Sequence, residues 1–138
     1  MTALPLPSLA VHGFSESAPQ ARLLAESLGA PFTDIEVHRF PDGESLVRID
    51  GAAETVVVYR SLDDPNDKLI ELMLAASALR DGGAKRLVLV TPYLCYMRQD
   101  MMFHPGEAIS QKVVCSFLDN LFDAVITVDP HLHRTSDL

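Results

Sequence analysis

An uninterrupted β-branched segment limits most strongly how this chain can fold. Thr55 to Tyr59 reads TVVVY, with three consecutive valines at its centre. Strands of this kind are buried on both faces, which is typical of parallel sheets. Further strands are predicted at Ser8 to His12, Arg86 to Thr91 and Ala124 to Asp129. Parallel strands need long crossover connections, so helices are expected between them.

Three segments with helical features alternate with these strands. The segment SAPQARLLAESLG has Ser17 as its predicted N-cap, Pro19 in its first turn and Gly29 just past its end. Two more helices are predicted at Asn66 to Arg80 and at roughly Ile109 to Asn120. The alternation predicts an α/β fold with a mostly parallel sheet and helices on both faces.

One part of the chain departs from this alternation. Phe32 to His38 and Glu44 to Asp50 are predicted to pair as an antiparallel hairpin around Pro41-Asp42-Gly43, a strong turn signal. The hairpin is expected to be a small appendage to the parallel sheet. Its turn, RFPDGE, carries an aromatic ring and two carboxylates, which an ordinary connection does not need.

Composition limits the classes of protein to which this chain can belong. A chain of 138 residues with 48% hydrophobic content is expected to form a single domain over residues 1–138. Its formal charge of -8 argues against a general nucleic-acid surface. The apolar runs are too short to cross a membrane. The two separated cysteines, Cys95 and Cys115, and the lack of a secretory leader indicate a reduced, cytoplasmic protein.

Ligands of open α/β sheets bind beyond the carboxyl ends of strands, so the segment after Thr91 is a candidate site. It reads PYLCYMRQDMMFHPGEAIS. The Arg98 guanidinium can bind a phosphate group through two hydrogen bonds, and Gln99 can add an uncharged donor. The alternative is a solvated loop arginine paired with Asp100, and the spacing alone leaves both interpretations open.

The segment VDPHLHR follows the last predicted strand. Asp129, His131 and His133 alternate there and could bind a divalent ion directly or through water. The alternative is that one histidine caps backbone groups while the other faces solvent. No further cluster of histidine and aspartate completes a structural zinc site. Neither of the usual glycine-rich phosphate-binding motifs occurs.

Taken together, RFPDGESLVRI, PYLCYMRQDMMFHPGEAIS and VDPHLH resemble three motifs of the N-terminal half of ribose-phosphate pyrophosphokinases, in the order of that family. The similarity runs from about Leu9 to the end of the chain. It implies a phosphoribosyltransferase-like fold. It also implies site residues, which fall into three groups: Phe40, Asp42 and Glu44 contacting adenine; Arg98 and Gln99 contacting the nucleotide; and His131 contacting the magnesium-ATP complex.

The resemblance further implies a function. Such an enzyme transfers the diphosphoryl group of ATP to ribose 5-phosphate with Mg²⁺, and its hairpin reaches the ATP site of a neighbouring subunit, so a homo-oligomer is expected. The motifs of the second domain, which holds ribose 5-phosphate, do not occur before Leu138, so this chain alone is expected to be inactive. Met101, Met102 and Arg134 stand where family members often have other residues.

Two other functions remain open at this stage. The first is a non-catalytic, synthetase-like regulatory or assembly subunit that keeps the fold and the oligomer surfaces. The presence of Arg98, Gln99 and His131 argues against it. The second is a stand-alone phosphoribosyltransferase, which is disfavoured because the acidic ribose-phosphate motif of that class is missing.

Overall fold

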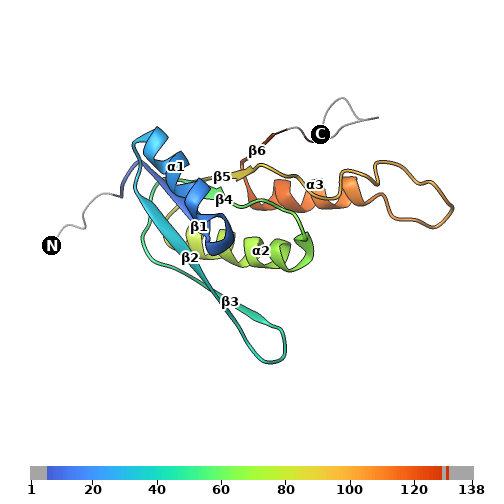
Figure 1. The fold of residues 1–138 in the computed structure, drawn as a ribbon, viewed down its shortest axis with the longest axis horizontal. Coiled ribbons are helices and arrows are strands. Elements are labelled where there is room, and N and C mark those ends of the chain that lie inside the picture. Colours follow the sequence, from blue (N-terminus) through green and yellow to red (C-terminus); the bar gives the residue numbers. More distant parts are fainter. Residues whose placement is uncertain (1–5, 129, 131–138) are drawn as a thin grey trace.

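The computed structural model describes residues 6–128 and residue 130. Their strands form one sheet with the order β3-β2-β1-β4-β5-β6 (Figure 1). β2 and β3 are antiparallel, whereas every other neighbouring pair is parallel. The predicted mostly parallel sheet is therefore confirmed. The strands are β1 (Leu9–Phe14), β2 (Phe32–Arg39), β3 (Ser45–Ile49), β4 (Thr55–Tyr59), β5 (Arg86–Thr91) and β6 (Ala124–Thr127).

Helices cover both faces of the sheet, as the sequence predicts. α1 (Ala18–Leu28) packs through Ala21 and Ala25 against one face, where Val11 and Val57 point. α2 (Pro65–Asp81) and α3 (Ser110–Leu121) cover the other face and share a larger apolar core with it. The middle of β4 is buried on both faces, which explains its unbroken run of valines.

The entry into α1 differs in one detail from the prediction. Ser17 is the last residue of the 3-10 turn Ser15–Ser17 and occupies the N-cap position of α1, but its side chain makes no capping hydrogen bond. Its hydroxyl oxygen instead lies 3.5 Å from the backbone nitrogen of Ser61, after β4. Ser17 is therefore the N-cap residue, as predicted, but its side chain contacts a neighbouring strand end instead of the first turn of the helix. Gly29 ends the helix as predicted, in the left-handed conformation with φ 63°.

A close approach fixes how α1 lies on the sheet. A Cβ atom at Gly13 would stand 2.7 Å from the Cβ of Ala21, a distance that real side chains do not adopt. Glycine in β1 therefore lets the helix backbone come near the strand. This approach places the end of β1 and the following 3-10 turn beside the end of β4, where Ser17 meets Ser61.

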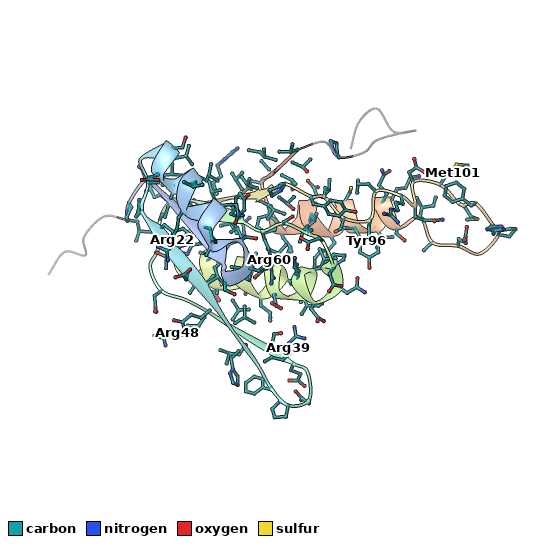
Figure 2. All side chains as sticks on the ribbon, viewed as in Figure 1. Arg22, Arg39, Arg48, Arg60, Tyr96 and Met101 are labelled. Atoms are coloured by element: carbon teal, nitrogen blue, oxygen red, sulfur yellow. The ribbon has the colours of Figure 1, made fainter. Side chains whose placement is uncertain are left out.

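The hairpin extends away from the rest of the sheet, as Figure 1 shows. Ile35 pairs with Ile49 and Val37 with Val47 on the face that turns toward α2, and β3 packs along that helix. The arginines labelled on the hairpin in Figure 2 are Arg39, at the end of β2, and Arg48, in β3. The predicted appendage is thus a two-stranded arm whose base is held by apolar packing.

No helix in the described part of the chain combines the length and the apolar character that crossing a membrane requires. The longest, α2, covers Pro65–Asp81 and carries charged residues along its length.

Candidate functional site

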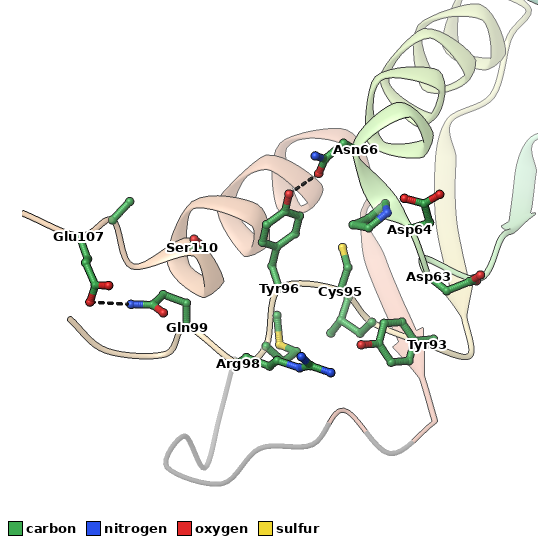
Figure 3. Close-up of a pocket in the computed structure, with 14 residues that line it drawn as sticks. Asp63, Asp64, Asn66, Tyr93, Cys95, Tyr96, Arg98, Gln99, Glu107 and Ser110 are labelled. Atoms are coloured by element: carbon green, nitrogen blue, oxygen red, sulfur yellow. Dashed lines mark hydrogen bonds between the residues drawn. The ribbon is translucent and has the colours of Figure 1, made fainter. Parts of the chain in front are cut away.

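A pocket of about 990 Å³ lies beyond the carboxyl end of β5 (Figure 3). Pockets of this volume are suited to small ligands such as nucleotides. Two helix N-termini meet there, because Pro65 and Asn66 begin α2 and Ser110 begins α3. The remaining lining residues come from the segments next to these helices: Asp63, Asp64, Tyr93, Leu94, Cys95, Tyr96, Met97, Arg98, Gln99, Glu107 and Ala108.

Two residues with unusual backbone conformations shape this pocket. Asp64 and Tyr96 both adopt positive φ, at 47° and 61°, although neither is glycine. Such a conformation costs about 1 kcal/mol or more for an ordinary residue, so surrounding contacts must maintain it. The Tyr96 hydroxyl donates a hydrogen bond to the side-chain oxygen of Asn66 (Figure 3). This bond ties the loop after β5 to the first turn of α2.

Arg98 lies in the pocket, beyond the carboxyl end of β5, as predicted. Its side chain is exposed, and within residues 6–128 it takes part in none of the ion pairs. The guanidinium is therefore placed to meet an anion that enters the pocket.

Gln99 also lies in the pocket, but much of its hydrogen bonding stays within the loop. Its amide nitrogen donates to the Met101 carbonyl oxygen at 2.9 Å and approaches Glu107 Oε1 at 3.4 Å. Its backbone carbonyl accepts a hydrogen bond from the Gln111 backbone nitrogen at 3.1 Å. That contact satisfies one of the donors that every helix leaves free in its first turn. Gln99 thus links the loop to the start of α3.

Glu107 organises the loop, a role that reasoning from the sequence does not identify. Its Oε1 accepts hydrogen bonds from the backbone nitrogens of Phe103, at 3.0 Å, and His104, at 2.7 Å. The same oxygen approaches the Gln99 amide. A carboxylate that accepts several backbone donors holds a turn firmly. The signal in the sequence is the Pro105-Gly106 turn directly before this glutamate.

The hairpin tip is built as a tight turn that presents its side chains to solvent. The backbone nitrogen of Phe40 donates to the Glu44 carbonyl at 2.8 Å, and Asp42 Oδ1 accepts from the Glu44 backbone nitrogen at 3.0 Å. Phe40 is 39% exposed and contacts His38 edge to face, with 4.9 Å between ring centroids. Phe40 is not part of either buried core cluster, so it does not anchor the hairpin to the core.

The structure does not bring the hairpin tip and the pocket together within one chain. None of Phe40, Asp42 and Glu44 lines the pocket that holds Arg98. The predicted magnesium contact, His131, lies outside the described residues. Within the part that the structure describes, no three histidine, cysteine, aspartate or glutamate side chains gather in a way that could hold a metal ion.

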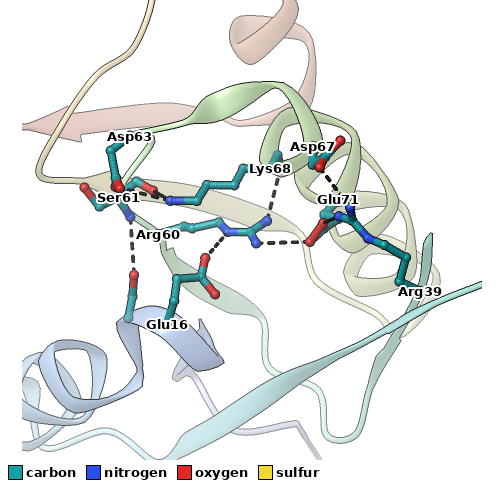
Figure 4. Close-up of polar contacts among 9 residues, drawn as sticks. Glu16, Arg39, Arg60, Ser61, Asp63, Asp67, Lys68 and Glu71 are labelled. Carbon is teal, nitrogen blue, oxygen red and sulfur yellow. Dashed lines mark hydrogen bonds and ion pairs between the residues drawn. The ribbon is translucent and has the colours of Figure 1, made fainter. Parts of the chain in front are cut away.

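A charge network fills the crevice at which ligands of such sheets commonly bind. The order of the parallel strands reverses between β1 and β4, and Glu16 and Arg60 follow these two strands. Arg60 Nε lies 2.5 Å from Glu16 Oε1, and Arg60 Nη2 lies 3.0 Å from Glu71 Oε1 on α2 (Figure 4). The guanidinium also stacks on the Phe14 ring at 3.8 Å. The pocket therefore lies beside this crevice rather than in it.

Cys95 lines the pocket but is unsuited to nucleophilic chemistry. Burial raises the pKa of its thiol to about 11. Since the thiolate is the reactive form, this side chain stays protonated and inert near neutral pH. Cys95 thus contributes apolar surface to the pocket wall.

Comparison with known proteins agrees with this geometry. The sequence pattern of the N-terminal domain of ribose phosphate pyrophosphokinase matches residues 9–121. Ribose-phosphate pyrophosphokinases from Methanopyrus kandleri and Saccharolobus solfataricus are each 40% identical to this chain, over 119 and 126 residues. These matches cover 85% and 88% of this chain and, in both cases, 41% of the relative.

A solved structure extends the agreement to the fold. The phosphoribosylpyrophosphate synthetase from Mycobacterium smegmatis superimposes with a TM-score of 0.78 and 26% sequence identity. The match covers 92% of this chain and 44% of that one. The chain therefore spans less than half the length of the relatives it matches. By its sequence and its fold, the chain belongs to the ribose-phosphate pyrophosphokinase family and corresponds to the N-terminal domain of its members.

Proposed function

We propose that this chain provides the ATP-binding part of an enzyme that transfers the diphosphoryl group of ATP to ribose 5-phosphate, forming phosphoribosyl pyrophosphate. The observation that carries the proposal is the position of Arg98 in the pocket beyond β5, without an ion-pair partner among the described residues. A guanidinium in a pocket of nucleotide size is suited to the oxygens of a polyphosphate.

The helix ends around the pocket support the same ligand. The first turns of α2 and α3 contribute Asn66 and Ser110 to its lining. Helix N-termini carry partial positive charge and free backbone donors, so they favour phosphate groups. Together with Arg98, they would stabilise the negative charge on the transferring phosphoryl oxygens.

Recognition of the adenine base is assigned to the hairpin. The turn carries two carboxylates, Asp42 and Glu44, which would repel a triphosphate but can accept a hydrogen bond from the amino group of adenine. The exposed Phe40 ring can stack on the base. Because the tip and the pocket are separate within one chain, we assign the hairpin to the pocket of a neighbouring subunit. The working protein would then be a homo-oligomer.

Magnesium fits this site with the nucleotide as its main ligand. Mg²⁺ in nucleotide enzymes is commonly held by one or two carboxylates and by substrate phosphates. The pocket offers the carboxylates of Asp63 and Asp64, and His131 is proposed as a further contact from the resemblance. When bound, the ion would neutralise part of the charge of the triphosphate.

Nucleotide binding tests the proposal directly. We expect the chain to bind a β,γ-methylene analogue of ATP in the presence of Mg²⁺, measured by calorimetric titration. Arg98→Ala should weaken binding by about ten- to a hundredfold, as expected for a lost charged hydrogen-bond donor. Arg22→Ala, which removes an exposed arginine from α1, is the matched control and should leave binding unchanged. Equal effects of the two substitutions would contradict the assignment of Arg98.

Catalysis is proposed to need more than this chain. The match covers 41% of the length of the Methanopyrus kandleri and Saccharolobus solfataricus relatives, and we assign ribose 5-phosphate to a second domain of a full-length enzyme. Because positioning both substrates lowers a barrier by several kcal/mol, the purified 138-residue chain should make no phosphoribosyl pyrophosphate. A full-length version should make it. A full-length protein that binds the nucleotide without turnover would instead support the non-catalytic subunit.

A further inference from the structure

The residue next to the hairpin tip is tied to a helix of the main body. Arg39 ends β2 and directly precedes Phe40. Its Nη1 lies 2.9 Å from Asp67 Oδ2, and its Nη2 lies 3.6 Å from Glu71 Oε2 (Figure 4). One guanidinium thus spans two carboxylates on consecutive turns of α2.

Helix geometry explains why both carboxylates face the hairpin. Asp67 and Glu71 stand four residues apart on α2 and therefore lie on the same side of the helix. Two like charges at this spacing repel each other. A guanidinium between them removes the repulsion, and the carboxylates raise the pKa of Arg39, chiefly through the hydrogen bond with Asp67. Its charge is therefore permanent under all ordinary conditions.

Glu71, the more buried of the two carboxylates, is a fixed anchor, unlike most partners of surface arginines. The side chain of Glu71 is 5% exposed, so its charge requires compensation within the protein. Its Oε1 receives Arg60, and its Oε2 receives Arg39. Arg60 is equally buried and is held by Glu16 and the Phe14 ring. The anchor is therefore connected through Arg60 to the ends of β1 and β4.

Apolar packing holds only the base of the hairpin. Ile35 is buried, and Ile49 and Val47 pack against the core, whereas Val37, which pairs with Val47, and Leu46, one residue nearer the tip, are exposed. Within residues 6–128, the ion pairs that join the hairpin to α2 are those of Arg39. Arg48, the other arginine of the arm, pairs only with the exposed Asp50 in that part of the chain.

We propose that Arg39 and Glu71 are positioning residues that fix the direction of the hairpin relative to α2. The pairing would hold Phe40, Asp42 and Glu44 at one angle to the body of the domain, in place of the apolar contacts that the outer arm lacks. The importance of this angle for ATP rests on the proposed function, in which the tip enters the pocket of a neighbouring subunit. A pre-oriented tip would bind without first having to be ordered.

The direction of the hairpin can be measured without nucleotide. Residual dipolar couplings and ¹⁵N relaxation of residues 40–45, compared with those of β4, report its angle and its mobility on the nanosecond scale. In Arg39→Ala, we expect a changed average angle and increased mobility of the tip, with β4 unaffected. Arg48→Ala is the matched control and should behave like the wild type. Arg39→Lys should be intermediate, because one ammonium group cannot span both carboxylates.

Titration with the β,γ-methylene analogue of ATP then distinguishes the positioning role of Arg39 from the proposed role of the hairpin in ATP binding. If both hold, Arg39→Ala weakens binding by about three- to tenfold, because a smaller fraction of molecules presents the tip correctly. A mobile tip with unchanged affinity would support the positioning role and overturn the assignment of the hairpin to the nucleotide. A tip with the same angle and mobility in Arg39→Ala and the wild type would overturn the positioning role itself.

Discussion

The Tyr96 hydroxyl donates a hydrogen bond to the side-chain oxygen of Asn66, and both residues line the pocket beyond β5. The bond joins the loop that carries Arg98 to the first turn of α2, which also carries Asp67. The start of α2 therefore contacts the pocket loop on one side and the hairpin on the other. A change in the position of this turn would affect both parts of the proposed ATP site.

Removing the Tyr96 hydroxyl should loosen the loop. We expect Tyr96→Phe to lower the free energy of unfolding by about 0.5 to 1.5 kcal/mol, the usual contribution of one hydrogen bond. The measurement is urea unfolding, with amide exchange of the loop as a second readout. Tyr93→Phe is the control, because the phenol of Tyr93 has no hydrogen-bond partner among those identified in the described residues. Equal losses in the two variants would contradict a specific role for the Tyr96 hydroxyl.

The sequence predicts the sheet well because its signals are local. The valines of β4, the alternation of strands with helices and the Pro41-Asp42-Gly43 turn each report on neighbouring residues only. Glu71 shows the limit of such signals. Its burial depends on Arg60, eleven positions earlier, and on Arg39 in the hairpin, and no helical pattern indicates a buried glutamate. Its role can be recognised only in the folded protein, where the ends of β1, β2 and β4 lie next to α2.

The candidate site likewise contains residues that the sequence indicates and residues whose role depends on the fold. Arg98 is found from the rule that ligands bind beyond strand ends, and the structure places it in the pocket. The sequence does not indicate the role of Glu107, because this residue accepts hydrogen bonds from backbone nitrogens that come near it only in the folded loop. The resemblance leads us to expect that Phe40 serves a neighbouring subunit, and in the structure Phe40 does not line the pocket of its own chain. That separation is a property of how the hairpin leaves the sheet.

Acid should destabilise the fold through His12. This side chain is 1% exposed, its Nδ1 has no hydrogen-bond partner in the described part of the chain, and burial lowers its pKa below 6.5. The unfolded chain therefore binds a proton that the folded one does not. Stability is complete above pH 6.5 and falls as the pH drops through and below that value, by at most about 1.4 kcal/mol per pH unit.

Urea unfolding between pH 8 and pH 5 measures this slope. His12→Leu should flatten it, whereas His38→Gln, on the exposed hairpin, should not. Carboxylates with lowered pKa values affect the free energy of unfolding only at lower pH. The Leu87 backbone nitrogen and Arg80 lower the pKa of Asp123 below 3.8, so its contribution is lost only below that pH. An unchanged slope in His12→Leu would exclude His12 as the cause.

The loop before α3 should depend on the charge of Glu107. Glu107→Gln leaves one weaker acceptor for the backbone nitrogens of Phe103 and His104. We expect hydrogen exchange of these two amides to accelerate by roughly tenfold, because a charged hydrogen bond is replaced by a neutral one. Glu26→Gln, on the exposed side of α1, is the control. Unaltered exchange at both amides in Glu107→Gln would show that the loop is ordered by other contacts.

Phe40 should affect nucleotide binding more than stability. Its ring is exposed and rests on His38 rather than in the core, so Phe40→Ala creates no cavity. Stacking of a base on an aromatic ring contributes about 1 to 3 kcal/mol, so the substitution should weaken ATP binding by roughly one to two powers of ten. The test is calorimetric titration of a full-length, oligomeric enzyme with an ATP analogue, beside a thermal melt, with Leu23→Ala on α1 as an exposed apolar control. Unchanged affinity with a lowered melting temperature would leave the ring a structural role only.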